Sequence, residues 1–287
     1  MTPYGSQSMI APLQSVLVRR PDDAFGVADP ALWHYTDTPD LLLARQEHDA
    51  FVNTLLAHGI EVAYHDAPLP DHADALFVHD PALITDRGAI LLRMGKPQRA
   101  GEEEAMAATL AQLGVPIHYR LHGAATAEGG DLLWLDQQTL CVGLGFRTNA
   151  AGFDQLAEAL AGSGVALFPV QLPYFDGPEA CLHLMSLISL VDVDLAVVYR
   201  PLLPVPFYQL LESRGVRLID VSDEEFATMG TNVLALAPRE CILLDHNIQT
   251  ARALEAAGCR VYPYRGDEMS LKAEGGPTCL TRPILRG

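Results

Sequence analysis

The sequence is poor in basic residues and in cysteine, and both shortages narrow the range of partners and folds. It contains 19 lysines and arginines against 36 aspartates and glutamates, which gives a formal net charge of −17 at pH 7. Such a field repels phosphate backbones and attracts cations, so we expect no nucleic acid partner. The five cysteines form no CxxC pair. They indicate free thiols in a reducing compartment, and exclude a disulfide framework or a zinc ribbon.

Long apolar runs and glycine-rich phosphate loops are also missing. No run of eighteen apolar residues occurs, and residues 1–10 do not have the basic, apolar pattern of an export leader. We therefore expect no membrane partner and a cytoplasmic location. Without a glycine loop that would bind a dinucleotide or a phosphate, no cofactor is predicted. The apolar content of 49% over 287 residues is nevertheless enough for a large core.

Helical periodicity recurs five times along the chain. The first segment starts at Asp40, a good N-cap, and ends at Gly59. The second follows Gly101, where three glutamates complement the positive end of a helix. The other three are 150–162, 205–215 and 247–258, and each ends at a glycine suited to the left-handed conformation after a helix. The helix starts are roughly fifty residues apart, which indicates a loosely repeated module.

Short apolar runs between these helices are typical of strands. They are residues 15–18, 75–78, 89–92, 132–135, 140–144, 195–199, 233–236 and 241–244. The short connections 136–139 and 237–240 favour antiparallel hairpins over the alternative of a doubly wound parallel sheet. Glycine and proline are dispersed and no linker is visible. We therefore predict one domain over residues 1–287.

Three residues far apart in the chain form a candidate catalytic set. Cys279 closes the segment Gly275-Gly276-Pro277-Thr278-Cys279, and His183 and Glu128 precede it. A cysteine is ordinarily a small buried hydrophobe, and a histidine among leucines is ordinarily a core residue. The combination of a thiol, a base and a carboxylate instead indicates a nucleophile with its activating partners. The other four cysteines (Cys141, Cys181, Cys241 and Cys259) are interpreted as packing residues.

Carboxylates near this set suit a cationic substrate. Asp74 and Asp80 flank the predicted strand 75–78, and with Glu128 they could bind a planar guanidinium through charge-assisted hydrogen bonds. A guanidinium group stays protonated and is a poor electrophile, so attack on its carbon requires both carboxylates and a strong nucleophile. We therefore expect a small cationic guanidino compound as the partner.

Five motifs now carry a resemblance to a known group of enzymes. They are residues 74–80 (Asp-Ala-Leu-Phe-Val-His-Asp), 128–131 (Glu-Gly-Gly-Asp), 143–149 (Gly-Leu-Gly-Phe-Arg-Thr-Asn), 183–186 (His-Leu-Met-Ser) and 275–279. In this order they resemble the dimethylarginine dimethylaminohydrolase, arginine deiminase and amidinotransferase superfamily, the penteins, from about residue 15 to the end. The resemblance implies a five-bladed α/β propeller of repeated ββαβ-type modules.

The resemblance also implies catalytic roles. Cys279 attacks the guanidinium carbon, and His183 protonates the departing amine. Water activated by His183 then hydrolyses the covalent S-alkylthiouronium intermediate. Glu128 orients His183 and binds the substrate, and no metal takes part.

Further residues are assigned to substrate binding by the same resemblance. Asp80 and Asp74 hold the guanidinium nitrogens, Arg99 and Arg147 bind the carboxylate of an amino-acid substrate, and Leu17 lies on a mobile flap. For the two arginines, ordinary ion pairing is the alternative.

Departures from the motifs limit the choice of substrate. His79 stands where dimethylarginine hydrolases often carry glutamate, and Met185 stands where arginine deiminases carry aspartate. The chain also lacks room for the extra helical region of the deiminases. Hydrolysis of dimethylarginine to citrulline and dimethylamine ranks first. A compact arginine dihydrolase or deiminase, which yields ornithine or citrulline plus ammonia, is the alternative, an amidinotransferase ranks third, and a homo-oligomer is left open.

Two other classes are weaker interpretations. The segments 71–74 (Asp-His-Ala-Asp) and 192–194 (Asp-Val-Asp) resemble ligand sets of manganese ureohydrolases, but their order does not match that family. A non-catalytic pentein binding protein would not need the intact set of Cys279, His183 and Glu128.

Overall fold

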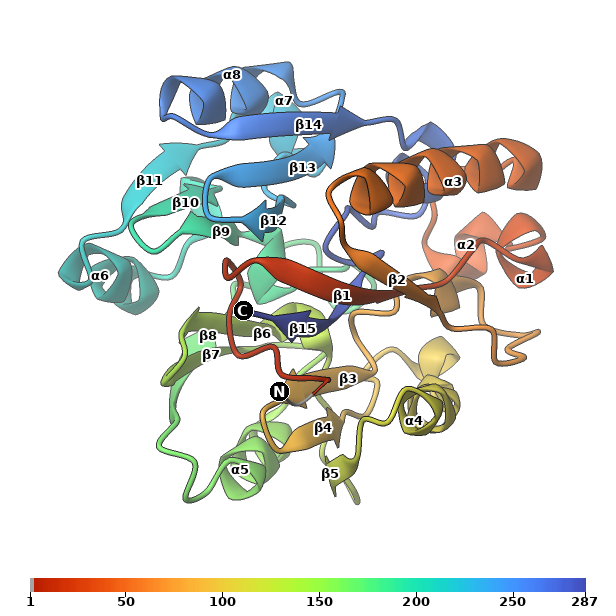
Figure 1. The fold of residues 1–287 in the computed structure, drawn as a ribbon, viewed down its shortest axis with the longest axis horizontal. Helices are drawn as coiled ribbons and strands as arrows, with labels where there is room; N and C mark the ends of the chain where they lie inside the picture. Colours follow the sequence, from red (N-terminus) through yellow and green to blue (C-terminus); the bar gives the residue numbers. More distant parts are fainter. Residues whose placement is uncertain (1–2) are drawn as a thin grey trace.

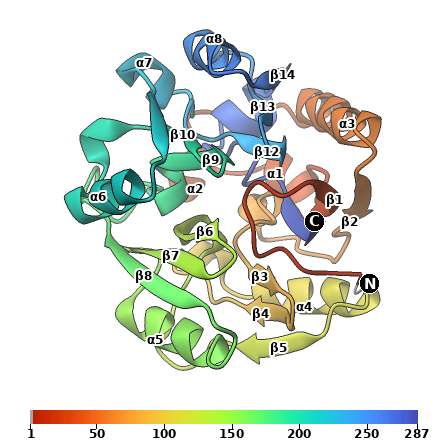
Figure 2. The same cartoon turned by 60° about the vertical axis from the view of Figure 1, so that its left-hand side comes forward.

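The computed structural model describes residues 3–287 as five three-stranded sheets set around a centre, with the long helices at the rim (Figures 1 and 2). In every sheet two strands form an antiparallel pair, and a third strand runs parallel to the middle strand. A helix precedes that third strand, because a parallel neighbour requires a crossover connection. The predicted five-bladed propeller of ββαβ-type modules is confirmed.

Four modules follow one another along the chain. They are β3 (Ala82–Thr85), β4 (Gly88–Leu91), α4 (Glu102–Gln112) and β5 (Ile117–Arg120); β6 (Leu132–Asp136), β7 (Thr139–Leu144), α5 (Ala150–Ala159) and β8 (Ala166–Gln171); β9 (Ile188–Asp192), β10 (Leu195–Val198), α6 (Val205–Ser213) and β11 (Arg217–Asp220); and β12 (Leu234–Ala237), β13 (Glu240–Leu244), α8 (Ile248–Ala256) and β14 (Arg260–Tyr264). Both predicted hairpins, β6 with β7 and β12 with β13, are confirmed as antiparallel pairs.

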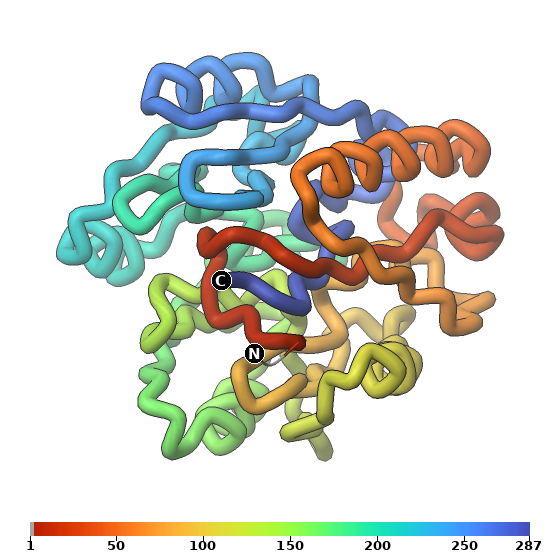
Figure 3. Tube along the Cα trace, viewed as in Figure 1, coloured from red at the N-terminus to blue at the C-terminus, as the bar shows by residue number. Residues whose placement is uncertain are grey.

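The fifth module joins the two ends of the chain. It consists of β15 (Arg282–Arg286), β1 (Leu13–Val18), α3 (Leu41–Ala57) and β2 (Glu61–Tyr64). β1 pairs antiparallel with β15 and parallel with β2. The red and blue ends of the trace therefore run side by side (Figure 3). This pairing closes the ring and holds Cys279, three residues before β15, close to the centre.

The five predicted helices are confirmed, and their ends follow from local chemistry. The Asp40 side chain accepts hydrogen bonds from the amides of Leu42 and Leu43 at 2.9 and 3.0 Å, so it caps α3 as expected. The glycines after the helices all have positive φ angles: Gly59, Gly114, Gly162, Gly215 and Gly258. Short helices at α1 (Asp23–Gly26), α2 (Pro30–Trp33) and α7 (Asp223–Phe226) were not predicted, because one turn leaves no periodicity to detect.

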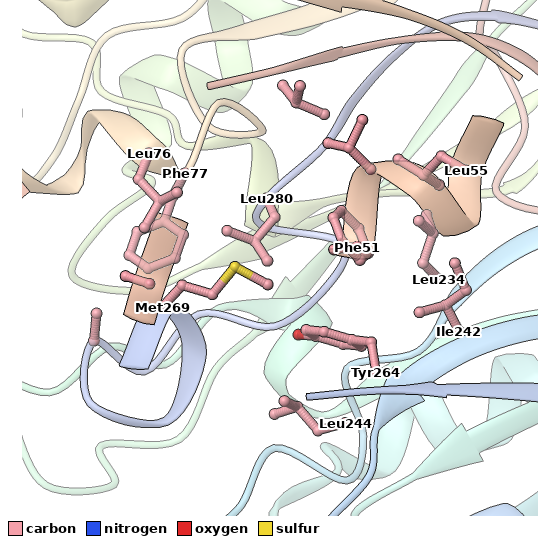
Figure 4. Close-up of a cluster of buried hydrophobic side chains, with 14 of the residues drawn as sticks. Phe51, Leu55, Leu76, Phe77, Leu234, Ile242, Leu244, Tyr264, Met269 and Leu280 are labelled. Carbon is pink, nitrogen blue, oxygen red and sulfur yellow. The ribbon is translucent and has the colours of Figure 1, made fainter. Parts of the chain in front are cut away.

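A large apolar cluster fixes the segments that carry the candidate site. Phe51 and Leu55 of α3 pack with Ile242 and Tyr264 of the fourth sheet (Figure 4). Leu76, Phe77, Met269 and Leu280 belong to the same cluster, so the segments before Asp80 and around Cys279 are anchored on it. Each fully buried side chain of this kind contributes about 1.5–3 kcal/mol to stability. The site is therefore built on a rigid part of the fold.

One predicted strand is wrong. Residues 75–78 lie in a 3₁₀ turn, Ala73–Leu76, and the residues that follow it, and not in a sheet. β4 pairs with β3 on one side and β5 on the other, so the run has no place beside it. The His79 amide instead donates to the carbonyl of Cys279 at 3.2 Å. Four apolar residues do not distinguish a strand from a buried turn.

Within residues 3–287 no helix has the length and apolar character needed to cross a bilayer.

Candidate active site

The structure brings seven of the eight predicted site residues to one cavity of about 40 Å³. They are Asp74, Asp80, Arg99, Glu128, Arg147, His183 and Cys279. Five of these residues lie in segments between successive modules, and Arg99 and Arg147 lie between the second strand and the helix of their modules. The closure of the propeller is what brings together carboxylates, imidazole and thiol that are as much as 205 positions apart, the separation of positions 74 and 279.

The eighth residue, Leu17, does not belong to this cavity, and its prediction as part of a mobile flap is wrong. Leu17 lies in β1, the central strand of its sheet, with no exposed surface. It packs with Val78, Ala82 and Ile84 in an apolar cluster. Its backbone is paired on both sides, with Arg282 of β15 and Ala63 of β2. A residue bonded in the centre of a sheet cannot act as a flap.

Glu128 and His183 form a buried hydrogen-bonded pair. Oε2 of Glu128 lies 2.7 Å from Nε2 of His183, and Oε1 accepts from the amides of Gly95 and Lys96 at 2.9 Å each. Burial alone would raise the pKa of Glu128, but the hydrogen bond from His183 and the nearby charge of Arg147 outweigh it and lower the pKa. The carboxylate is therefore ionised, and it holds the imidazole in one orientation.

His183 is the basic partner of this pair. Burial would lower its pKa, but the neighbouring Cys181, Asp80 and Asp131 outweigh burial and raise the pKa well above its ordinary value. The ring is thus an imidazolium near neutral pH. This is the protonation state that a general acid requires.

The two glycines after Glu128 allow His183 to approach. A Cβ atom on Gly130 would collide with the His183 ring, and one on Gly129 would collide with the carbonyl of His79. Asp131 accepts hydrogen bonds from the Leu184 amide at 2.9 Å and from a threonine hydroxyl at 2.6 Å. Asp131 therefore has a structural role, because it holds the backbone next to His183. The Glu-Gly-Gly-Asp motif holds both the carboxylate and the backbone beside the imidazole.

Cys279 is held by an asparagine that was not predicted to take part. Nδ2 of Asn232 donates to its Sγ at 3.3 Å, and Oδ1 of Asn232 accepts from the Thr278 amide at 3.0 Å. Burial, Asp80 and Cys181 raise the pKa of Cys279 to about 11, against the smaller opposing effects of His183 and Asn232. The resting group is therefore a thiol. A cation placed beside it would lower its pKa.

The glycines before Cys279 let its segment pass close to two side chains. A Cβ atom on Gly275 would overlap the Phe77 ring, and one on Gly276 would overlap Asn232. The segment that was singled out in the sequence is thus a close-approach segment.

Asp80 is held by backbone and by Arg99. Its Oδ1 accepts from the Gly130 amide at 2.9 Å, and its Oδ2 lies 2.5 Å from Nη1 of Arg99. Burial would raise the pKa of Asp80, but the charges of Arg99, His183 and His79 outweigh it and lower the pKa strongly. Asp80 therefore presents a negative charge to the cavity.

The role predicted for Arg99 as a clamp for a substrate carboxylate is contradicted. Its Nε and Nη2 donate to Glu102 at 2.9 and 2.7 Å, and Nη2 also donates to the carbonyl of Phe77 at 2.9 Å. Since Nη1 donates to Asp80, all three guanidinium nitrogens of Arg99 already donate to acceptors of the protein. The ion-pair alternative is therefore the correct one for Arg99.

Arg147 differs from Arg99. Its Nη1 lies 3.7 Å from Oε2 of Glu128, beyond hydrogen-bond distance, and its guanidinium makes no hydrogen bond to any of residues 3–287. It is buried and lines the cavity. Its N–H fork is free to bind an acceptor.

Asp74 is also paired within the protein. Its Oδ2 lies 2.6 Å from Nζ of Lys96, and its Oδ1 accepts from the Tyr35 hydroxyl at 2.8 Å. Lys96 donates in addition to the carbonyl of Trp33 at 2.8 Å. Neither Lys96 nor Tyr35 was predicted to line or support the site. Both lie outside the five motifs that identified most of the candidate site residues.

The interpretation of Cys181 as a packing residue is wrong. Its side chain is exposed, lines the cavity and places Sγ 3.6 Å from Nδ1 of His183. The only available signal was its position two residues before the predicted base. The other three packing assignments agree with the structure, in which Cys141, Cys241 and Cys259 are buried.

The cavity carries an excess of negative charge. Five carboxylates line it, Asp74, Asp80, Glu128, Glu179 and Glu274, against the three permanent cations Lys96, Arg99 and Arg147. This balance favours a cationic ligand.

A metal ion is the other cation to consider. The ligand atoms of Asp80, Glu128 and His183 all lie within 4.8 Å of one another. Arg99 lies on Asp80 and Arg147 beside Glu128, and their charges oppose a divalent ion. The acidic pair at 192–194, part of the manganese alternative, instead binds Arg239 at 2.6 and 2.7 Å.

Comparison with known proteins places this site in a family. The profile of the arginine deiminase family matches residues 65–205 and 201–286. The chain belongs to the arginine deiminase family. It is 30% identical over 271 residues to a dimethylarginine dimethylaminohydrolase of Streptomyces coelicolor, an alignment that covers 94% of this chain and 96% of the relative. It is 29% identical over 257 residues to the arginine deiminase of Mycobacterium marinum, covering 75% of this chain but only 63% of that enzyme.

Solved structures agree on the fold. A dimethylarginine dimethylaminohydrolase of Pseudomonas aeruginosa, in complex with citrulline, matches with a TM-score of 0.80 at 22% identity and covers 95% of this chain and 100% of that one. The N-terminal domain of a cyanobacterial arginine dihydrolase matches with a TM-score of 0.80 at 21% identity, over 95% and 97% of the chains. The pentein resemblance and the enzyme class predicted from the sequence, a hydrolase of C–N bonds in linear amidines, are confirmed at the level of the family.

Proposed function

We propose that this guanidino-group hydrolase converts dimethylarginine to citrulline and dimethylamine through an S-alkylthiouronium intermediate on Cys279. One observation carries the proposal: a thiol, an imidazolium paired with a carboxylate, and an ionised aspartate line one acidic cavity. The S. coelicolor relative supports the methylated substrate, because its similarity extends over nearly the full length of both chains.

The charges of the cavity account for binding. Asp80 and Glu128 hold the planar guanidinium through charge-assisted hydrogen bonds. Arg147, whose fork is free, pairs with the α-carboxylate of the amino acid. Arg99 is a positioning residue, because it fixes Asp80 and does not reach the substrate.

Substrate binding also activates the nucleophile. The guanidinium cation beside Sγ lowers the pKa of Cys279 from about 11, and the thiol proton leaves to solvent. The thiolate attacks the guanidinium carbon and forms a C–S bond. As the C–N bond to the dimethylamino group breaks, His183 donates its proton to the departing nitrogen. This leaves a cationic thiouronium on Cys279 and a neutral imidazole.

The second half of the reaction restores the site. Neutral His183 takes a proton from water, and the hydroxide formed attacks the thiouronium carbon. The C–S bond breaks and the thiolate takes up the proton of the new hydroxyl group, so the product carries a neutral ureido group and Cys279 returns to its thiol form. The net change is dimethylarginine plus water to citrulline plus dimethylamine. His183 ends as an imidazolium, held again by Glu128.

A compact arginine dihydrolase or deiminase is the second candidate. The segment Met229–Leu236 resembles the dihydrolase branch, and its Asn232 binds the sulfur of Cys279. The same nucleophile and base would then act on unmethylated arginine. An amidinotransferase would use the same first half-reaction and deliver the amidino group to an amine in place of water.

Product identification separates these candidates. Purified protein and the Cys279→Ala variant are incubated with asymmetric dimethylarginine and with arginine, and the products are identified by mass spectrometry. Citrulline and dimethylamine from the wild type alone establish the proposal. Ornithine or citrulline from arginine, with dimethylarginine unchanged, moves the assignment to the dihydrolase or deiminase, and activity in Cys279→Ala rejects the covalent mechanism.

A further inference from the structure

A second cavity lies at the centre of the propeller. The first strand of each module, β3, β6, β9, β12 and β15, contributes to its wall, and Ser6, Ser8 and Met9 contribute from the N-terminal segment. We call it the axial cavity. Its volume is about 20 Å³. It is separate from the candidate active site, with which it shares no lining residue.

Two buried arginines line the axial cavity, and no carboxylate among residues 3–287 lines it with them. Arg282 is 3% exposed and Arg286 is 8% exposed. Burial lowers the pKa of both groups to about 9, so both remain cations at neutral pH. Arg286 is satisfied in part, because it donates to the carbonyls of Ala11 and Ala235 at 2.7 and 2.9 Å.

Arg282 has no such partners. Its guanidinium makes no hydrogen bond and no ion pair with any of residues 3–287, and its Nε and Nη2 atoms are fully buried. Asp80 is the acidic group that raises its pKa, but both oxygens of Asp80 accept from Arg99 and Gly130. A buried charge without a partner costs several kcal/mol. The site is therefore incomplete as the protein alone builds it.

A third unpartnered donor lies in the same wall. Trp134 is 2% exposed, lines the axial cavity, and its indole Nε1 is buried with no acceptor among residues 3–287. Guanidinium and indole nitrogens donate only. The missing partner must therefore accept hydrogen bonds, and to offset Arg282 it must be negative. Water would accept these bonds but would leave the charge unbalanced.

The volume restricts the partner further. A cavity of roughly 10–15 Å³ is enough to hold one water molecule. The axial cavity, at about 20 Å³, therefore has room for one water molecule or one monatomic ion. We propose that the axial cavity is an anion site that holds one chloride-sized anion against the Arg282 guanidinium and the Trp134 indole N–H.

The anion would sit directly behind the candidate active site. His79 and Thr278 line the axial cavity, and the next residues along the chain, Asp80 and Cys279, line the active-site cavity. The anion neutralises Arg282 and fixes the backbone that presents the nucleophile. Its binding is independent of which guanidino compound is the substrate.

Bromide, which replaces chloride and scatters X-rays anomalously, tests the site on the wild-type protein. Crystals grown in bromide are expected to show an anomalous peak in the axial cavity within hydrogen-bond distance of Arg282. Bromide at the molecular surface only, with the axial cavity holding water, would overturn the proposal.

Thermal unfolding tests the same site in solution. When chloride replaces a large anion such as gluconate at constant ionic strength, the Tm should rise by about 2 °C or more, because chloride binds only the folded state. Arg282→Met should abolish this response, and Trp134→Phe should weaken it. Arg260→Met, which removes an exposed arginine, is the matched control and should respond like the wild type. An undiminished chloride response in Arg282→Met would refute the assignment.

Discussion

The two central cavities of this propeller have opposite charge, although neighbouring residues of the same loops line both. The active-site cavity has five carboxylates against three permanent cations, whereas the axial cavity has two arginines and no carboxylate among the described residues. In the first, Lys96 and Arg99 are paired, so the excess charge is negative. In the second, Arg282 is unpaired, so the excess is positive. The local balance in each cavity, and not the net charge of −17, indicates the charge of its ligand.

The comparison also shows how the fold separates chemistry from support. The active-site cavity is lined mainly by loops and turns, which place reactive groups, and each of the five sheets contributes a strand to the wall of the axial cavity. Changes in the first should therefore appear in turnover, and changes in the second should appear in stability.

The largest expected effect is loss of the nucleophile. Cys279→Ala should lower kcat by about 10⁴-fold or more, because the proposed covalent intermediate forms on the Cys279 sulfur. The unfolding midpoint should change little, since the sulfur makes a single hydrogen bond. Cys181→Ala, which removes the other thiol of the cavity, is the control and should keep measurable turnover. Comparable activity in Cys279→Ala and wild type would reject the role of Cys279.

The next effect is loss of the acid and base. His183→Gln should lower kcat by about 10²–10⁴-fold, with a much smaller change in KM, because the imidazolium acts on the departing amine. His118→Gln replaces a histidine outside both cavities and should leave kcat unchanged. If His183→Gln changed KM alone, the residue would bind substrate without transferring a proton.

Asp80→Asn perturbs both cavities, since Asp80 neutralises Arg99 and acts electrostatically on Arg282. We expect a loss of about 3 kcal/mol in the free energy of unfolding, since a buried cation loses one of its carboxylates. Asp192→Asn removes a carboxylate from the more exposed Arg239 and should cost about 1 kcal/mol or less. Urea unfolding of the two variants measures the difference. Equal losses would show that burial does not distinguish the two pairs.

A smaller effect concerns the acidity of the thiol. In a Cys181→Ser background, alkylation of Cys279 by iodoacetamide should accelerate about tenfold per pH unit from pH 7 to 9, because its pKa is raised to about 11. Burial and Asp80 disfavour the thiolate, so its fraction keeps rising with pH throughout this range. A rate that levels off below pH 8 would mean that the thiolate is already formed without substrate.

The parts of the fold that the sequence predicted are those set by neighbours in the chain. Asp40 as N-cap, the glycines after the five helices, and the hairpin connections each act within a few residues. For the third, parallel strand of each sheet, no residue range was predicted from the sequence. In β2 and β5, for example, its residues are half-buried or exposed and form no continuous apolar run.

The candidate site was predicted from motifs, and the errors lie where long-range pairing decides. Arg99 matches a substrate-binding position, but Glu102 and Asp80 occupy its guanidinium. Leu17 was assigned to a flap, but β15 arrives from the other end of the chain and holds it in a sheet. The axial cavity left no local signal at all, because Arg282 and Trp134 lie in ordinary strands of different modules.

Trapping the covalent intermediate tests the central claim most directly. Turnover of dimethylarginine is quenched with acid, and the protein is digested and examined by mass spectrometry. The account predicts a thiouronium adduct on the peptide that contains Cys279, none on the peptide that contains Cys181, and no adduct in Cys279→Ala. Turnover without an adduct on Cys279, accompanied by activity in Cys279→Ala, would contradict it.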